Sequence, residues 1–201
     1  CLLHIHGGPM SHFQRQFAAH PYYYVPAALC ERGMAVLRCN PRGSSGYGRA
    51  FRAAVRRDWG GGDYRDLQQG VDTLIQLGIA DPDRLGICGW SYGGYLTSWA
   101  ITQTDRFKAA SIGAAVVNLF SFTGTSDIPG FIPDYMGSEF WEDPTLYQAR
   151  SPLYHVQHVQ TPAIIQHGAA DGRVPLEQGL QFHNALKRRG VPVETSIYPR
   201  E

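Results

Sequence analysis

Several features that would assign a chain to a particular class are missing from this sequence of 201 residues. No apolar run approaches the ~20 residues that a membrane-spanning helix needs, and no secretory signal pattern is present, so we expect no membrane contact. The formal net charge is only +1, and the basic residues are scattered rather than clustered. An even charge distribution of this kind argues against a nucleic-acid partner.

Metal-ligating patterns are also missing. The four cysteines show no C-x-x-C or zinc-ligand spacing; they are Cys1, Cys30, Cys39 and Cys88. His4 and His6 share one face of a predicted strand, but no further ligand accompanies them. We therefore expect no metal and no cofactor. The cysteine pattern favours a reduced, cytoplasmic setting, with two disulfides remaining as the alternative.

What the sequence does contain is a regular alternation of apolar runs and helix-like stretches. With 43% hydrophobic residues, it can bury the core of one domain. Short apolar runs predict buried strands over residues 1–6, 34–39, 84–89, 108–116, 162–167 and 192–198. Helices are predicted over residues 24–32, 63–78, 92–103 and 175–189, with Asp63 as the N-cap of the second. The alternation indicates an α/β domain with a parallel sheet.

One stretch breaks this alternation. Residues 118–152 interleave seven aromatic residues with proline and glycine, and they show neither helical nor strand periodicity. We interpret them as an irregular insertion over the carboxyl edge of the sheet, where ligands bind in such folds.

The strongest chemical signal is Gly89-x-Ser91-x-Gly93, which follows a predicted strand and precedes a predicted helix. A serine at such a turn is exposed at the top of the sheet, and the flanking glycines avoid clashes, as in the nucleophile elbow of hydrolases. The spacing alone also occurs by chance in glycine-rich chains. The strand and helix around it favour Ser91 as a nucleophile.

Two further segments fit the chemistry of such a serine. An oxyanion hole takes one N–H from the residue after the nucleophile, here Tyr92, and a second from a loop after an earlier strand. The glycines of residues 6–9, HGGP, could supply the second, although the segment could also be an ordinary turn. Asp171 follows a later strand and a glycine turn, where this fold carries its acid; the alternative is a residue that only shapes the turn.

Together these pieces resemble the catalytic domain of the prolyl oligopeptidase family of serine peptidases, over nearly the whole chain. The resemblance is carried by HGGP at 6–9, NPRGSSGYG at 40–48, WGGGDYRDL at 59–67, GWSYGGY at 89–95, RSPLYHV at 150–156 and HGAADGRVP at 167–175. It implies an α/β-hydrolase fold with a mostly parallel sheet flanked by helices.

The resemblance also implies roles for individual residues. Ser91 would be the nucleophile, Asp171 would orient the base, and Arg173 would bind a carbonyl of the substrate backbone. Prolyl endopeptidase-like members carry a tyrosine where this chain has His6. The pattern is therefore closer to the acylaminoacyl-peptidase branch, in which the Gly8 N–H would join that of Tyr92 in the oxyanion hole.

Two family features are expected outside residues 1–201. The family carries an N-terminal β-propeller, and its catalytic histidine follows the last strand, which here would place that histidine just after Glu201. We therefore interpret the sequence as a partial peptidase domain that is inactive by itself. His183, the only histidine after Asp171, is predicted to pack within a helix.

The leading hypothesis is a serine peptidase that hydrolyses short peptides through an acyl-enzyme. A carboxylesterase with the same triad is the alternative enzyme, and Arg173 argues against it because an ester lacks an extended peptide backbone. A non-catalytic interaction domain is the third possibility. Exo- or endopeptidase action, residue preference and oligomeric state stay open.

Overall fold

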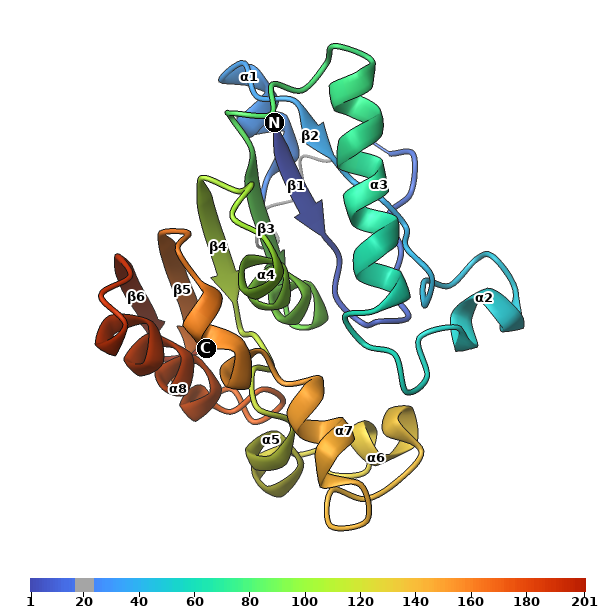
Figure 1. Cartoon of the computed structure of the whole chain (residues 1–201), viewed down its shortest axis with the longest axis vertical. Helices are drawn as coiled ribbons and strands as arrows, with labels where there is room; N and C mark the ends of the chain where they lie inside the picture. Colours follow the sequence, from blue (N-terminus) through green and yellow to red (C-terminus); the bar gives the residue numbers. More distant parts are fainter. Residues whose placement is uncertain (17–23) are drawn as a thin grey trace.

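A six-stranded sheet forms the centre of the computed structural model, which describes residues 1–16 and 24–201. All neighbouring strands are parallel, in the order β2-β1-β3-β4-β5-β6 (Figure 1). The strands are β1 (Leu2–Ile5), β2 (Val36–Leu37), β3 (Gly86–Trp90), β4 (Ala109–Gly113), β5 (Ala163–Gly168) and β6 (Val193–Tyr198). The predicted α/β class with a parallel sheet is confirmed.

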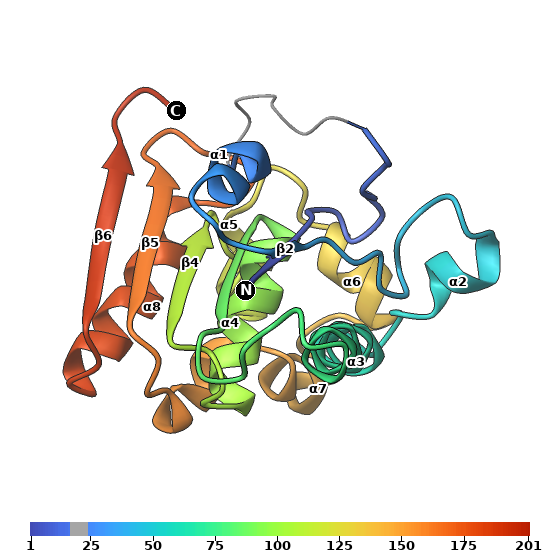
Figure 2. The ribbon, with the colours of Figure 1, turned by 90° about the horizontal axis from the view of Figure 1, so that it is seen from above.

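Helices cover both faces of this sheet. Figure 2 shows α1 (Pro26–Glu31) on one side, with α3 (Gly62–Gln76) and α4 (Tyr92–Gln103) on the other. The last helix, α8 (Leu176–Arg188), connects β5 to β6. All four predicted helices are therefore present. None of the helices in the described part of the chain has the length and apolar character needed to cross a bilayer.

The segment predicted to be irregular, residues 118–152, instead forms three short helices. They are α5 (Leu119–Thr125), α6 (Phe131–Met136) and α7 (Pro144–Ala149), followed by a 3-10 helix, η1 (Pro152–His158). Figure 1 shows α5, α6 and α7 gathered beyond the arrowheads of the strands, the predicted place. A further helix that the sequence analysis missed, α2 (Arg49–Ala53), is too short to produce a periodic apolar pattern.

The predicted N-cap role of Asp63 is wrong. Helix α3 begins one residue earlier, at Gly62, and its N-cap is Gly61, which has no side chain to offer. Asp63 lies inside the first turn and is completely buried. Its carboxylate therefore has partners elsewhere in the fold.

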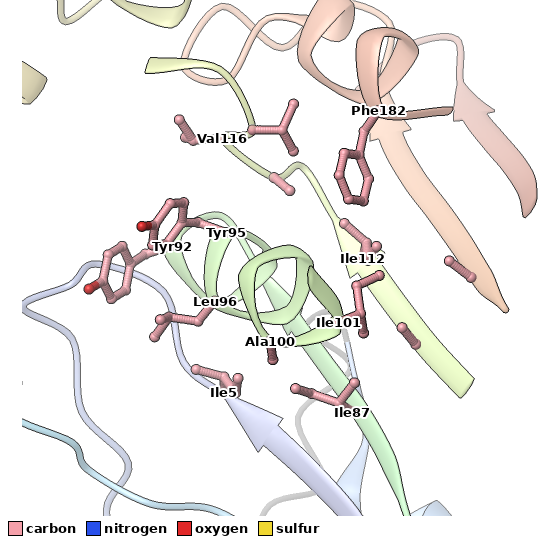
Figure 3. Close-up of a cluster of buried hydrophobic side chains, with 14 of the residues drawn as sticks. Ile5, Ile87, Tyr92, Tyr95, Leu96, Ala100, Ile101, Ile112, Val116 and Phe182 are labelled. Carbon is pink, nitrogen blue, oxygen red and sulfur yellow. The ribbon is translucent and has the colours of Figure 1, made fainter. Parts of the chain in front are cut away.

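Helix α4 is the centre of the core. It is buried from Tyr92 to Thr102, so it has no polar face, unlike an ordinary surface helix. Figure 3 shows Leu96 and Ala100 toward Ile5 and Ile87 of the sheet. Because α4 is buried on every side, the position of its first residue is fixed, and so is the position of Ser91, which precedes it.

The strand order reverses direction at β1. From β1 the chain passes to β2 on one side, and then to β3 on the other side of β1. The loops that leave β1 and β3 therefore diverge, which opens a crevice at the carboxyl ends of these two neighbouring strands. These loops are HGGP and the Gly-x-Ser-x-Gly turn, so the topology brings the two sequence motifs together.

Candidate active site

Ser91 occupies the single residue between β3 and α4, with φ 58° and ψ −119°. Such a backbone conformation is strained for a residue with a side chain and persists only where the surroundings enforce it. Two hydrogen bonds hold it: the Ser91 N–H donates to the Gly113 carbonyl, and the Tyr95 N–H donates to the Ser91 carbonyl, both at 2.9 Å. The predicted elbow geometry is therefore present.

Glycines around Ser91 allow the surrounding backbones to pack without side chains. A Cβ at Gly89 would lie 2.4 Å from the Gly93 carbonyl carbon, and one at Gly93 would lie 2.3 Å from the Ile5 carbonyl oxygen. One at Gly94 would lie 2.3 Å from the Gly113 carbonyl oxygen. Each distance is far below a normal van der Waals contact, so the elbow requires glycine at all three positions.

The HGGP loop lies directly against this elbow. A Cβ at Gly7 would be 3.6 Å from the Ser91 Cβ. Gly8 has φ 124°, a conformation in which glycine is preferred, and it lines the same cavity as Ser91 and Tyr92. The buried His6 ring contacts the Gly7 carbonyl through Nδ1 and the Ser44 hydroxyl through Nε2, at 2.7 and 2.9 Å. Burial lowers the pKa of His6, which favours its neutral form.

The turn after β5 holds Asp171. One oxygen of its carboxylate accepts hydrogen bonds from the N–H groups of Arg173 and Val174, at 3.0 and 2.9 Å. The Arg173 guanidinium is exposed and donates to the Asp127 carboxylate at 2.7 Å. The second Asp171 oxygen has no hydrogen bond from the described residues, and it remains available to a partner.

Two hollows meet at Arg173. The first, of about 320 Å³, is lined by Gly8, Ser91, Tyr92 and Arg173 together with apolar side chains: Met10, Trp59, Val116, Phe122, Ile128, Phe131 and Val174. The second, of about 560 Å³, contains Asp171, Trp90, Tyr198 and Glu201. The structure thus gathers four of the five predicted site residues around one cavity, and Asp171 lines the adjoining hollow.

No histidine within residues 1–16 and 24–201 is hydrogen-bonded to Ser91 or Asp171. His167, nearest to the acid in sequence, is fully buried, and its Nε2 contacts the Val174 carbonyl at 2.6 Å. His183 contacts the Thr195 hydroxyl at 2.8 Å, as expected for a histidine that packs between α8 and β6. Among the described residues, no histidine therefore connects Ser91, the candidate nucleophile, with Asp171, the candidate acid.

Asp63 is the residue of this region that the sequence analysis assigned to the wrong role. Its Oδ2 accepts hydrogen bonds from the Tyr92 hydroxyl and from the Gly60 N–H, and its Oδ1 accepts from the Tyr64 N–H. Burial raises the pKa of the Asp63 carboxyl from 3.8 to about 6, against the effect of these hydrogen bonds. The signal available in the sequence was its place in WGGGDYRDL, one of the segments that carry the family resemblance.

Comparison with known sequences places the chain in a family. The sequence profile described as "Prolyl oligopeptidase family" matches residues 20–201. The uncharacterized peptidase YuxL of Bacillus subtilis is 42% identical over 200 residues, which are 98% of this chain and 30% of that protein. The acylamino-acid-releasing enzyme of Arabidopsis thaliana is 35% identical over 98% of this chain and 26% of its own length.

Solved structures give the same result. An acylaminoacyl peptidase in complex with Z-Gly-Gly-Phe-chloromethyl ketone superposes with a TM-score of 0.90 at 31% identity, over 100% of this chain and 32% of that one. A Mycobacterium tuberculosis puromycin-hydrolyzing peptidase gives 0.89 at 33% identity, over 98% and 29%. The chain thus spans less than a third of the length of each of these four relatives.

Proposed function

The chain belongs to the prolyl oligopeptidase family, and from that premise we propose that it forms the catalytic part of a serine peptidase for short peptides. One observation carries the proposal above the others. Ser91 is held in a strained elbow at the mouth of an apolar cavity that also contains a guanidinium and two candidate oxyanion donors. Strain maintained at a cavity by tight glycine packing is expected of a reacting group.

The chemistry assigned to these residues is acyl transfer. The Ser91 oxygen attacks the carbonyl carbon of the scissile peptide bond and gives its proton to the base. The N–H groups of Tyr92 and Gly8 donate to the oxyanion that forms. The base then protonates the leaving amine, which departs and leaves an acyl-enzyme ester on Ser91. Water attacks that ester by the same steps in reverse and regenerates the serine.

The base in this proposal is the histidine expected to follow Glu201. The Glu201 carbonyl accepts a hydrogen bond from the Ala170 N–H at 2.7 Å, and Glu201 lines the same hollow as Asp171. A residue shortly after Glu201 would therefore start beside the free oxygen of Asp171, which could receive its N–H. The N-terminal β-propeller remains part of the proposal too. This chain covers only 30% and 26% of the two relatives' lengths, which is consistent with a further domain in the whole protein.

The apolar cavity indicates which substrate residue is bound. Its walls are aromatic and aliphatic, and Arg173 is the one charged group that the described residues contribute to its lining. An apolar side chain on the acyl side of the scissile bond would fill the cavity, and the Arg173 guanidinium would donate to the next backbone carbonyl. A related peptidase was solved in complex with Z-Gly-Gly-Phe-chloromethyl ketone, whose phenylalanine has this character.

The nucleophile is tested with a fluorophosphonate probe on the full-length protein. Ser91→Ala should abolish labelling, because the probe reacts with an activated serine. Ser98→Ala is the matched control: this serine is buried in α4, the helix that follows Ser91, and has no hydrogen-bond partner among the described residues, so labelling should be retained. Labelling that survives Ser91→Ala would remove Ser91 from the mechanism, and an unlabelled wild-type protein would support the interaction-domain alternative.

The esterase alternative needs a separate measurement. The wild-type protein is assayed on an N-acetylated aminoacyl anilide with an apolar acyl-side residue, whose acetyl carbonyl takes the place of the next backbone carbonyl, and on a simple p-nitrophenyl ester. A peptidase should hydrolyse the anilide efficiently, since only that substrate offers Arg173 a backbone carbonyl. Turnover of the ester alone would assign the site to a carboxylesterase.

A further inference from the structure

Asp63 is a carboxylate buried at the site without a cation to pair with. Its relative exposure is 0%, and no ion pair involving it is found among the described residues. Taking a charge out of water costs several kcal/mol unless good partners replace the water. At this position an apolar residue would avoid that cost, so folding stability alone does not explain an aspartate.

The partners of Asp63 belong to two elements of the active site. Its Oδ2 accepts from the hydroxyl of Tyr92, the residue after the nucleophile, and from the N–H of Gly60 at 3.3 Å. Gly60 follows Trp59, whose ring packs edge-on against the Tyr92 ring with centroids 4.7 Å apart. Trp59 and Tyr92 both line the cavity of Ser91. One carboxylate oxygen therefore joins the Tyr92 side chain to the backbone that follows Trp59.

Among the described residues, the Tyr92 side chain has no other polar partner. Its ring is buried and stacks on the Tyr95 ring with centroids 5.5 Å apart, and its hydroxyl donates a hydrogen bond to Asp63 (Figure 3 shows the two rings side by side). A hydrogen bond to a carboxylate is about twice as strong as one between neutral groups. Asp63 therefore fixes the Tyr92 ring, and because the ring is attached to the same residue, it restrains the direction of the Tyr92 N–H.

We propose that Asp63 is a positioning residue of the active site: through the Tyr92 hydroxyl it aims the Tyr92 N–H at the oxyanion and sets the wall between Trp59 and Tyr92. The inference rests on the proposed peptidase function. Asp63 contacts no substrate itself. Its effect is expected mainly in kcat, since an oxyanion donor acts more strongly on the transition state than on the bound substrate.

The ionisation of Asp63 is consistent with this role. Burial raises the pKa of its carboxyl to about 6, so at pH 7.5 the group is ionised and accepts from Tyr92. The charged and titratable groups around it are Asp58 and Arg42 from the neighbouring loops, and Tyr92 and Tyr95 from α4. Arg42 is paired with Asp66 at 2.6 Å, so it does not neutralise Asp63. Asp58 is itself an anion and is paired with Arg150 at 3.0 Å.

The test is a double-mutant cycle in the full-length protein, with an aminoacyl anilide as substrate at pH 7.5. Asp63→Asn removes the charge, and Tyr92→Phe removes the hydroxyl while keeping the backbone N–H. Each should lower kcat about tenfold, a fraction of the 10²–10³ lost with a whole oxyanion donor, and change KM less than about threefold. The double variant should also lose about tenfold, because both changes break one interaction.

Asp72→Asn is the matched control, since Asp72 lies on the same helix in an exposed ion pair with Arg106 and should leave kcat unchanged. Losses that multiply to about a hundredfold in the double variant would overturn the inference, because the two groups would then act independently. So would a wild-type kcat in either single variant. If Asp63→Asn does not fold, the kcat of Tyr92→Phe alone tests the inference. A wild-type protein without turnover would instead refute the proposed function and, with it, this inference.

Discussion

The two sides of the candidate site are built in different ways. On the side of the nucleophile, backbone packs against backbone: Gly93 lies under the Ile5 carbonyl and Gly94 under the Gly113 carbonyl, with no room for a methyl group. On the side of the acid, the turn around Asp171 is exposed, and a Cβ at Gly172 would meet nothing within 4 Å. That turn is held by polar contacts, among them the Asp127–Arg173 pair.

Core packing therefore determines the geometry on one side of the site, and surface contacts determine it on the other. The position of Ser91 follows from the core, so a change beside it affects folding and activity together. The positions of Asp171 and Arg173 depend on hydrogen bonds and an ion pair at the surface, where each contact contributes about 1 kcal/mol or less. Changes on the acid side should therefore affect activity while leaving stability nearly intact.

The largest effect is expected from Gly93→Ala. Its Cβ would lie 2.3 Å from the Ile5 carbonyl oxygen, so β1 and α4 would have to separate. We expect a loss of at least about 4 kcal/mol in stability, or failure to fold. Gly172→Ala, the matched change on the acid side, should stay within about 0.5 kcal/mol. Thermal unfolding of the full-length proteins measures both, and equal melting temperatures would contradict the comparison.

The second prediction concerns pH and the strand under the elbow. Burial, with smaller contributions from Arg38 and His6, lowers the pKa of His4 from 6.5 to about 4. The unfolded chain binds a proton at His4 more readily than the folded protein does. The free energy of unfolding therefore decreases as the pH falls from 6.5 towards 4. Over the full window this amounts to about 3 kcal/mol, at 1.36 kcal/mol per pKa unit.

His4→Phe, which keeps an aromatic ring against Phe13 and Tyr24, should remove this dependence. Its stability relative to the wild type should therefore rise as the pH is lowered, as followed by urea unfolding at pH 7.5 and pH 4.5. A stability difference that stays the same at both pH values would show that His4 titrates normally.

A smaller effect is expected from Arg173→Ala. If its guanidinium binds the substrate backbone, kcat/KM on peptides should fall by about 1.5–3 kcal/mol, the value of a hydrogen bond to a charged group. Hydrolysis of a small ester should change much less, and so should the melting temperature, because this side chain is exposed. Equal losses on both substrates would identify a structural arginine.

The smallest effect is expected from Asp127→Asn. Its carboxylate lies 2.7 Å from the Arg173 guanidinium in an exposed pair, and such pairs contribute about 0–1 kcal/mol. The variant should fold as the wild type does and raise KM for peptides about twofold, because Arg173 would be held less firmly. A lower KM would show that Asp127 competes with the substrate for the guanidinium.

The elbow was predictable because its determinants are local. A strand, two glycines around Ser91 and a following helix are adjacent in sequence, and their sterics need no distant partner. The strands were predicted for the same reason, as continuous apolar runs. The short helices within residues 118–152 could not be predicted, because six or seven residues make too few turns for a periodic pattern to emerge.

The interactions that the sequence analysis missed join residues far apart in the chain. Asp63 reaches Tyr92 across 29 positions, and Arg173 reaches Asp127 across 46. An aspartate near the start of a helix looks like a cap, and only the packing of α3 beside α4 shows that it is buried. Local chemistry therefore predicted the backbone turn at Ser91, and the tertiary structure was needed to find the side chains packed around it.

The backbone of Ser91 has a consequence for how this gene would evolve. At φ 58° and ψ −119°, serine costs on the order of 1–3 kcal/mol that glycine would not. A duplicated copy released from catalysis would gain stability by replacing this serine with glycine, which adopts a positive φ without strain. Serine at this position is thus maintained only while selection acts on its chemistry, and its loss would be an early mark of a copy that has taken up another role.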